Sequence, residues 1–261
     1  MPWGLTEIYV VLPAYVLVLS RVAGLMLAAP FFSGAILPTR LKVLLAASIA
    51  LAVFPVTISR LTVPVTLMSA AAGLLGELAV GLLLGMGVSL VLMGVQLGIQ
   101  LTSQQAGMAL GEVFNPMLES NLPVVAELYY FVSMVIFLAV GGHRALVRTL
   151  LDSFEAVPPL GFVVSEGVVA LLTDLMMVSF TLAIRVGGPM IIALLLGLMT
   201  LGFLSRTMPQ LNILTIGFPI KIALALLVMA LTIMWLEPLL LQGLSLAVDA
   251  VREGMGMEGL Y

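Results

Sequence analysis

The run from Leu78 to Leu101 constrains the fold more than any other feature, because it contains no charged residue. A membrane-spanning helix needs about 20 apolar residues to cross a hydrocarbon core of about 30 Å. The helical pattern extends over about 67–105, which is too long for one upright crossing. We therefore predict a helix that tilts, kinks or rises out of the bilayer. Glycines four residues apart favour close packing against neighbouring helices, at positions Gly81 and Gly85 and again at Gly94 and Gly98.

The composition extends this interpretation to the whole chain. Hydrophobic residues make up 62% of it and charged residues 9%, whereas about 25% charged residues is usual in soluble domains. The excess of hydrophobic residues must face lipid or partner subunits, so we expect an all-α integral membrane protein or membrane-derived assembly. The net charge of −3 argues against a nucleic-acid partner, and the absence of cysteine excludes disulfides and thiolate metal sites.

About six apolar stretches follow one another, and proline or glycine interrupts nearly all of them. They cover about 8–29, 41–54, 67–105, 124–140, 167–204 and 217–251. We predict that Pro55 ends the second stretch, that residues 187–189 kink or split the fifth, and that residues 237–238 kink the last. The first stretch is interpreted as a span and not as a removed signal. Basic residues do not cluster in alternate loops, so the positive-inside rule indicates no orientation.

Residues 104–123, QQAGMALGEVFNPMLESNLP, interrupt the long helix. Gly107 and Gly111 loosen the backbone, and Asn115-Pro116 favours a turn. Irregular backbone in an apolar protein is stable only where it packs in protein or lines a wet cavity. One interpretation is a loop folded into a pore or assembly interior. The other, which the residue pattern alone favours, is an ordinary connecting loop at the membrane surface.

Polar side chains inside the apolar stretches are further candidates for function. Arg21 lies where a charge costs about 2.5–3.5 kcal/mol or more in lipid, so it should face a partner. Two interpretations of Arg21 stay open, a functional role and a structural ion pair. Gln96, Gln100 and Gln104 share one helix face, which favours an interface between helices over a substrate path. The remaining charged residues with an expected structural role are Arg40, Lys42, Asp174, Arg185 and Arg206.

The motifs exclude several classes of enzyme. The sequence has no nucleophile elbow, no metalloprotease motif and no phosphate-binding loop. The single histidine, His143, is expected to be a hydrogen-bonded structural residue. We therefore expect a non-enzymatic protein without a cofactor or metal. Asp174 keeps an alternative open, a small-solute membrane transporter or channel, because such proteins carry acids deep in their spans.

Several stretches, in order along the chain, carry a resemblance to a known family. They are RVAGLMLAAPFFS at 21–33, PTRLK at 38–42, Gly142-His143 with 151–154 and 159–161, RTMPQLN at 206–212, and GFPIK at 217–221. Together they resemble the FliR family of flagellar type III export-gate proteins. Two positions depart from the family pattern. Neutral Asn115 stands where relatives often carry aspartate, and LGLM occupies 196–199, where many carry asparagine or aspartate.

The resemblance implies a subunit of the flagellar export gate that helps form and plug the entrance channel for unfolded secreted flagellar proteins. It implies bent helical hairpins packed in a helical hetero-oligomer with FliP-like and FliQ-like subunits, beside FlhB-like and FlhA-like components. Residues 1–261 would form one FliR-like domain, with a FliP-like part over about 1–165 and a FliQ-like hairpin over about 166–261. The implied location is the bacterial inner membrane, in the flagellar basal body, with the assembled core largely on the periplasmic side.

The family's pore-plugging loop maps onto about 107–122, which reverses the preference for an ordinary loop. The resemblance thus implies a channel plug formed by Gly107, Met108, Leu110, Gly111, Val113, Phe114, Asn115, Pro116 and Met117. The expected constriction consists of the large apolar members of this set, Met108, Leu110, Val113, Phe114 and Met117.

Overall fold

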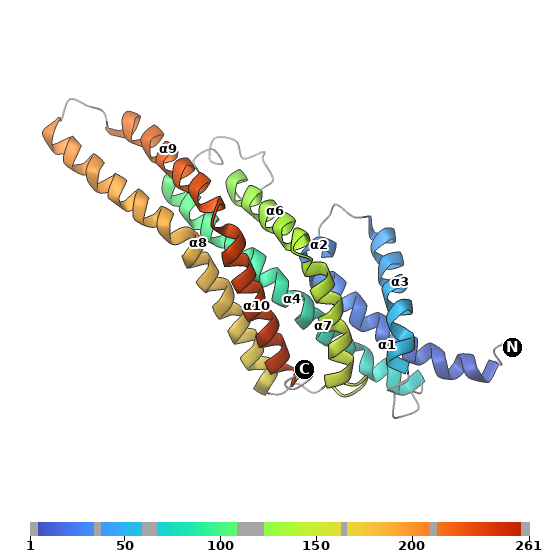
Figure 1. The fold of residues 1–261 in the computed structure, drawn as a ribbon. Coiled ribbons are helices and arrows are strands. Elements are labelled where there is room, and N and C mark those ends of the chain that lie inside the picture. The colour runs from blue at the N-terminus through green and yellow to red at the C-terminus, as the bar shows by residue number, and fades with distance from the viewer. Residues whose placement is uncertain are drawn as a thin grey trace. The chain divides into compact units, whose positions relative to one another are not determined.

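The computed structural model describes residues 5–33, 38–58, 67–108, 123–162, 166–208 and 213–256. Within these ranges the regular structure is entirely helical (Figure 1), which confirms the all-α prediction. Four helices are long and apolar enough to cross a membrane, or up to six spans result if each of two bent pairs counts as one. The prediction of about six apolar stretches is therefore confirmed.

The chain forms two compact units. Unit 1 comprises 1–90, 140–175 and 245–261, and unit 2 comprises 91–139 and 176–244. Three helices pass from one unit into the other: α4 (Leu67–Ala106), α8 (Glu166–Thr207) and α10 (Leu236–Gly254). Each unit combines stretches that are far apart in the sequence. The family resemblance instead implies two consecutive parts that meet near residue 165, and that division stays a prediction.

Unit 1 contains α1 (Leu5–Ala28), the short α2 (Pro30–Ser33), α3 (Thr39–Ile58) and α7 (Gly142–Ala156), with parts of the shared helices. α1 and α3 pack against each other (Figure 1). Tyr15 of α1 donates a hydrogen bond to the Ala47 carbonyl at 3.1 Å. The Tyr15 ring also meets Phe54 edge-on, with 5.7 Å between centroids.

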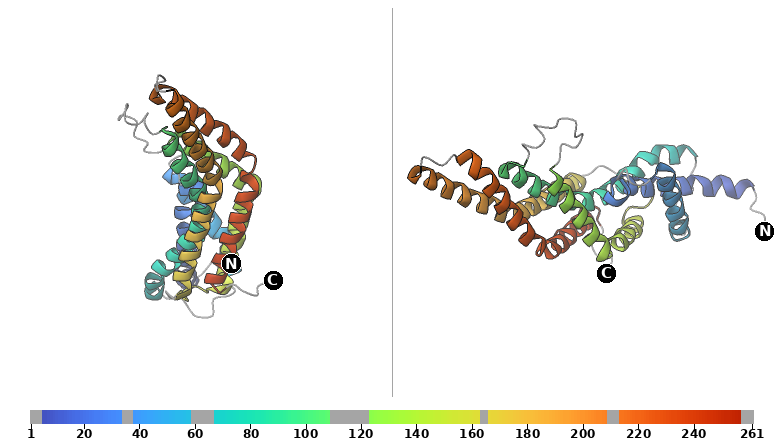
Figure 2. Two further views of the ribbon diagram at one scale, coloured as in Figure 1. Left: turned by 90° about the vertical axis from the view of Figure 1, so that its left-hand side faces the viewer. Right: turned by 90° about the horizontal axis from the view of Figure 1, so that it is seen from above.

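Unit 2 contains α6 (Val124–Ala139) and α9 (Ile213–Ile233), with the remaining parts of α4, α8 and α10. α8 and α9 lie side by side and run in opposite directions (Figure 1, Figure 2). The buried Tyr129 hydroxyl of α6 donates to the Met229 carbonyl of α9 at 2.5 Å. This bond satisfies a phenol that would otherwise be buried without a partner.

Glycines allow neighbouring helices to approach to backbone contact in both units. In unit 1, a Cβ on Gly85 would lie 2.7 Å from the Leu25 carbonyl oxygen of α1. In unit 2, a Cβ on Gly94 would lie 2.5 Å from the Ser179 carbonyl oxygen of α8, and Gly98 faces Ala183 in the same way. The predicted close packing at these spacings is confirmed.

Three predicted helix breaks are corrected by the structure. α3 continues through Pro55 to Ile58, because a proline removes one helical hydrogen bond without preventing the last turn from closing. α8 is one continuous helix, so the predicted split at 187–189 is wrong, while the predicted kink there stays a prediction. The final bend, of 62°, lies at residues 234–235 and not at 237–238. Pro238 instead occupies the first turn of α10, where its missing N–H has no helical partner to lose.

Candidate functional site

The segment between α4 and α6 begins with a glycine cap in unit 2. Gly107 follows the end of α4 with φ of 88°, a conformation that side chains disfavour. Its N–H donates to the Gln104 carbonyl at 3.0 Å, and the Met108 N–H donates to the Ser103 carbonyl at 3.0 Å. This pair of bonds is a Schellman motif, which satisfies the last carbonyls of the helix.

The same glycine lies against α9. A Cβ on Gly107 would lie 2.5 Å from Cε1 of Phe218, so both the backbone angle and the neighbouring ring require glycine here. Met108 then packs against a buried cluster formed by Ala106, Leu194 and Ala225. The first two residues of the predicted plug are therefore anchored on α4, α8 and α9.

The far end of the segment is also fixed within unit 2. Pro123 is buried, and its carbonyl accepts hydrogen bonds from Ala126 at 2.8 Å and Glu127 at 3.3 Å as α6 begins. The Tyr129–Met229 bond joins this first part of α6 to α9. Both ends of the segment are thus attached to α9. The other predicted plug residues lie outside the described part of the chain, and the plug stays a prediction for Leu110, Gly111, Val113, Phe114, Asn115, Pro116 and Met117.

A buried cluster around Arg21 is the main polar site of unit 1. Arg21 is 0% exposed, and its Nε donates to Oε2 of Glu77 at 2.7 Å. Its Nη1 donates to the Ser153 carbonyl at 2.9 Å, and its Nη2 donates to the Val157 carbonyl at 2.9 Å. The guanidinium also lies 4.1 Å from the centre of the Phe154 ring. The cluster therefore joins α1 and α4 to the end of α7.

Glu77 completes this cluster by accepting a second hydrogen bond. Its Oε1 accepts from the Leu160 N–H at 3.0 Å, in the turn after α7. Of the two interpretations left open for Arg21, the structure shows the structural ion pair. Glu77 lies inside α4 and is 1% exposed. It is the only carboxylate in α4, and this was the available signal for it as the partner of Arg21.

The remaining predicted residues are spread over several helices. Gln96 and Gln100 are half-buried on α4, while Gln104 is exposed near its end, and the interface role of this face stays a prediction. Arg185 donates to Gln242 Oε1 of α10 at 2.6 Å. Among the other charged residues, Arg40 at the start of α3, Asp174 within α8 and Arg206 in its last turn are exposed, and Lys42 of α3 is half-buried. No group of three potential metal ligands occurs within the described ranges.

Comparisons with known proteins identify what the chain is similar to. A family model described as "Bacterial export proteins, family 1" matches residues 12–246. Flagellar biosynthetic protein FliR of Escherichia coli strain K12 is 29% identical over 212 residues, covering 81% of each chain. FliR of Pectobacterium carotovorum is 27% identical over 84% of this chain and 83% of its own. FliR of Bacillus subtilis strain 168 is 24% identical over 70% of this chain and 72% of its own.

Proposed function

The chain belongs to family 1 of the bacterial export proteins, and from this membership we propose that it is a subunit of the flagellar protein export apparatus. The observation that carries the proposal is the family match over 12–246, which covers all of unit 2, most of unit 1 and the segment between α4 and α6. The flagellar assignment is supported by relatives named as flagellar biosynthetic proteins that are matched over most of their length.

We propose that its partners are FliP-like and FliQ-like subunits, with FlhB-like and FlhA-like components nearby, and that it acts on unfolded flagellar proteins without catalysing a reaction. The exposed apolar side chains on α3, α8 and α9 support an assembly of this kind, because such surfaces need lipid or protein to cover them. The proposed location is the bacterial inner membrane, within the flagellar basal body. The finer part of this proposal places most of the assembled core on the periplasmic side.

Removal of the gene from its own bacterium is expected to abolish flagellar protein secretion and swimming. A tagged chain that restores both should co-purify from membranes with a fixed set of export subunits, whose copies are counted by native mass spectrometry. Normal flagella in the deletion strain would contradict the proposal. Transport of a small solute by the purified chain alone, lost on Asp174→Asn, would favour the transporter alternative.

The proposed mechanism is gating by the segment over about 107–122. In the closed state the segment seals the channel against ions and water, and an arriving unfolded chain displaces it with energy supplied by other components. The geometry at its two ends supports this role. Because Gly107 and Tyr129 both attach to α9, the intervening residues have fixed points from which to reach into a channel.

Replacing residues 109–122 by a glycine–serine linker of equal length is expected to make the assembled complex leak small ions. Gly107 and Met108 are kept because they cap α4 and pack in unit 2. The measurement is ion flux through vesicles containing the purified complex. Asp174→Asn is the control, since Asp174 is exposed on α8 and should leave the vesicles tight. An unchanged flux in the linker variant would rule out the plug.

A further inference from the structure

α9 carries one charged residue, Lys221, and nothing in the described part of unit 2 neutralises it. Lys221 is half-buried, and its ammonium makes no ion pair or hydrogen bond with the described residues. The described acids of unit 2 are Glu127 and Glu237, and both are exposed in the first turns of other helices. Because a buried charge without a partner is costly, a lysine in this position indicates a carboxylate that is supplied from elsewhere.

Contacts on either side of Lys221 fix where it lies on α9. Three residues before it, Phe218 meets Gly107 at the end of α4. Three residues after it, Leu224 faces α8, since a Cβ on Gly197 would lie 2.9 Å from its Cδ2. Lys221 is therefore midway between these two contacts, both along α9 and around it. It lies beside α8, at the level where α4 ends.

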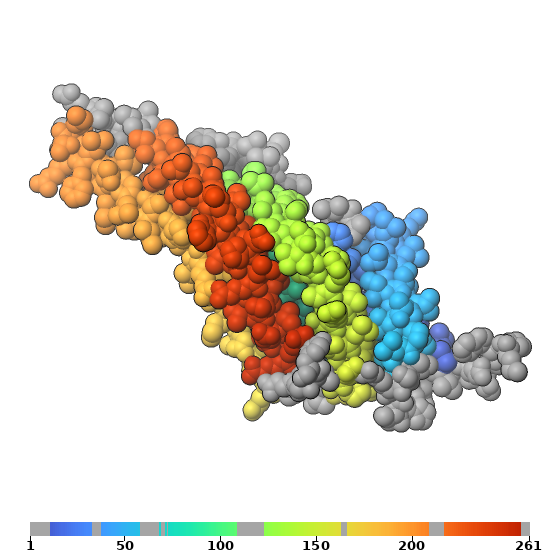
Figure 3. Space-filling model, in the orientation of Figure 1, coloured from blue at the N-terminus to red at the C-terminus, as the bar shows by residue number. Residues whose placement is uncertain are grey.

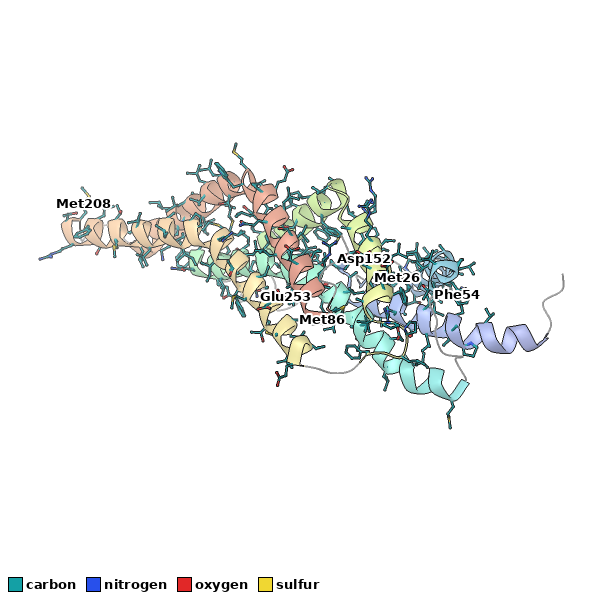
Figure 4. The ribbon with its side chains drawn as sticks, turned by 60° about the horizontal axis from the view of Figure 1, so that its bottom comes forward. Met26, Phe54, Met86, Asp152, Met208 and Glu253 are labelled. Carbon is teal, nitrogen blue, oxygen red and sulfur yellow. The ribbon has the colours of Figure 1, made fainter. Side chains whose placement is uncertain are left out.

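The neighbouring part of α8 offers no counter-charge. Because α8 and α9 run in opposite directions (Figure 2), the Gly197 contact places Lys221 beside about residue 200 of α8. Residues 186–205 contain no aspartate, glutamate, lysine or arginine. Met208, which follows the end of α8 (Figure 4), is about 12 Å beyond residue 200 at 1.5 Å per residue. The lysine is therefore set back from the tip of the hairpin, among apolar side chains.

The surface around Lys221 is apolar and open. Ile220 of α9 is 44% exposed, and Met199 and Phe203 of α8 are 56% and 73% exposed. Both helices lie at the surface in the space-filling view (Figure 3). Apolar surfaces of this kind need a cover, and a cation within one requires that the cover also carry negative charge. An apolar helix of a partner subunit that bears one carboxylate meets both requirements.

We infer that Lys221 is the docking point for a carboxylate on an apolar helix of a partner subunit that packs over α8 and α9. This assignment rests on the proposed membership of an export assembly and is independent of the plug. The exposed apolar side chains supply the contact area. The charge pair fixes which helix binds and in which register, because a single polar contact in an apolar interface penalises every other alignment.

Substitutions of Lys221 test this role through the yield of assembled complex, purified from the bacterium that normally makes the chain. Lys221→Met removes the charge, and Lys221→Glu places a like charge opposite the partner carboxylate. We expect Lys221→Met to lower the yield about tenfold or more and Lys221→Glu to lower it further. Lys221→Arg should assemble normally, since it keeps the charge. Ile220→Met is the matched control and should also assemble normally, because it alters the adjacent exposed position without removing charge.

The isolated chain should respond in the opposite direction. Lys221→Met removes a half-buried charge that has no partner within the described part of unit 2. The free energy of unfolding of the purified chain in detergent micelles should therefore stay unchanged or rise. A lowered free energy of unfolding that parallels the loss of complex would show that the lysine stabilises the fold itself, and would overturn the inference.

Carbodiimide cross-linking of the complex identifies the carboxylate, because the reagent joins an amine to a carboxylate in contact with it as an amide. The chain has two lysines, Lys42 and Lys221, so cross-linked peptides can be assigned by mass spectrometry. We expect Lys221 to be joined to an aspartate or glutamate of a partner subunit. Exchanging the two charges, by Lys221→Glu together with lysine at the partner position, should then restore assembly.

Three further results would overturn the inference. A cross-link from Lys221 to Glu112 or Glu119 of its own chain would show an internal pair. Loss of assembly without any cross-link at Lys221 would show another anion, such as a lipid phosphate. Undiminished assembly of Lys221→Met would show that the charge has no role in docking. Co-purification of the unsubstituted chain with export subunits separates these outcomes from failure of the proposed function, because that result does not depend on Lys221.

Discussion

Replacing Arg21 by leucine is expected to destabilise unit 1 by about 3–5 kcal/mol, the usual cost of removing one partner from a buried ion pair. Glu77 would remain 1% exposed without its cation, while Leu160 alone would still donate to it. The Val157 carbonyl would lose its donor as well, while the Ser153 carbonyl would keep only the hydrogen bond from the Val157 N–H. The free energy of unfolding, measured by denaturant titration in detergent micelles, checks this value.

A paired substitution separates the cost of leaving the buried Glu77 without its cation from the cost of the lost hydrogen bonds. Arg21→Leu with Glu77→Leu removes both charges, and apolar replacements of buried pairs are often neutral or stabilising. We expect recovery of most but not all of the loss, because the Leu160 N–H and the Val157 carbonyl remain without partners at about 0.5–1.5 kcal/mol each. Arg40→Leu is the control, since Arg40 is exposed. A single Arg21→Leu variant as stable as this control would contradict the role of the cluster.

The sequence predicted the Arg21 site in part, for a clear physical reason. A lone arginine among apolar residues indicates a partner, because an unpaired charge there is costly. The identity of the partner depends on how α1 and α4 cross. The spacing of Gly81 and Gly85 predicted close packing against a neighbouring helix, but only the structure shows that this helix is α1. The contribution of Ser153 and Val157 is made by backbone carbonyls, which every residue possesses and no sequence pattern marks.

The long helices were predictable because their signal is a sustained absence of charge. α4 covers Leu67–Ala106, within one residue of the predicted end. The breaks were less predictable, because proline has different effects at different helix positions. Pro55 and Pro189 lie inside helices, and Pro238 lies in a first turn. Near Pro189, the contact of Gly187 with the Gly98 backbone shows tertiary packing supporting a helix that local propensity would weaken.

Replacing Gly98 by leucine is expected to disrupt the packing of α4 against α8 in unit 2. A Cβ at this position would lie 3.1 Å from both the carbonyl carbon and the Cα of Ala183, and closer still to its carbonyl oxygen. These are backbone atoms, which cannot rotate away as a side chain can. Overpacking commonly costs about 1–3 kcal/mol, and we expect the upper end of this range or more, measured as unfolding free energy in micelles and as yield of assembled complex.

Gly188→Leu on α8 is the matched control for this prediction. A Cβ on Gly188 would meet nothing within 4 Å, and leucine is a better helix former than glycine by up to about 1 kcal/mol. The control should therefore be neutral or slightly stabilising, although the neighbouring Gly187 packs so closely that a Cβ on it would lie 2.8 Å from the Gly98 carbonyl oxygen. An equal loss of unfolding free energy from the two substitutions would show that the effect does not depend on backbone contact between α4 and α8. A loss confined to Gly98→Leu would establish that backbone contact between α4 and α8 holds unit 2 together.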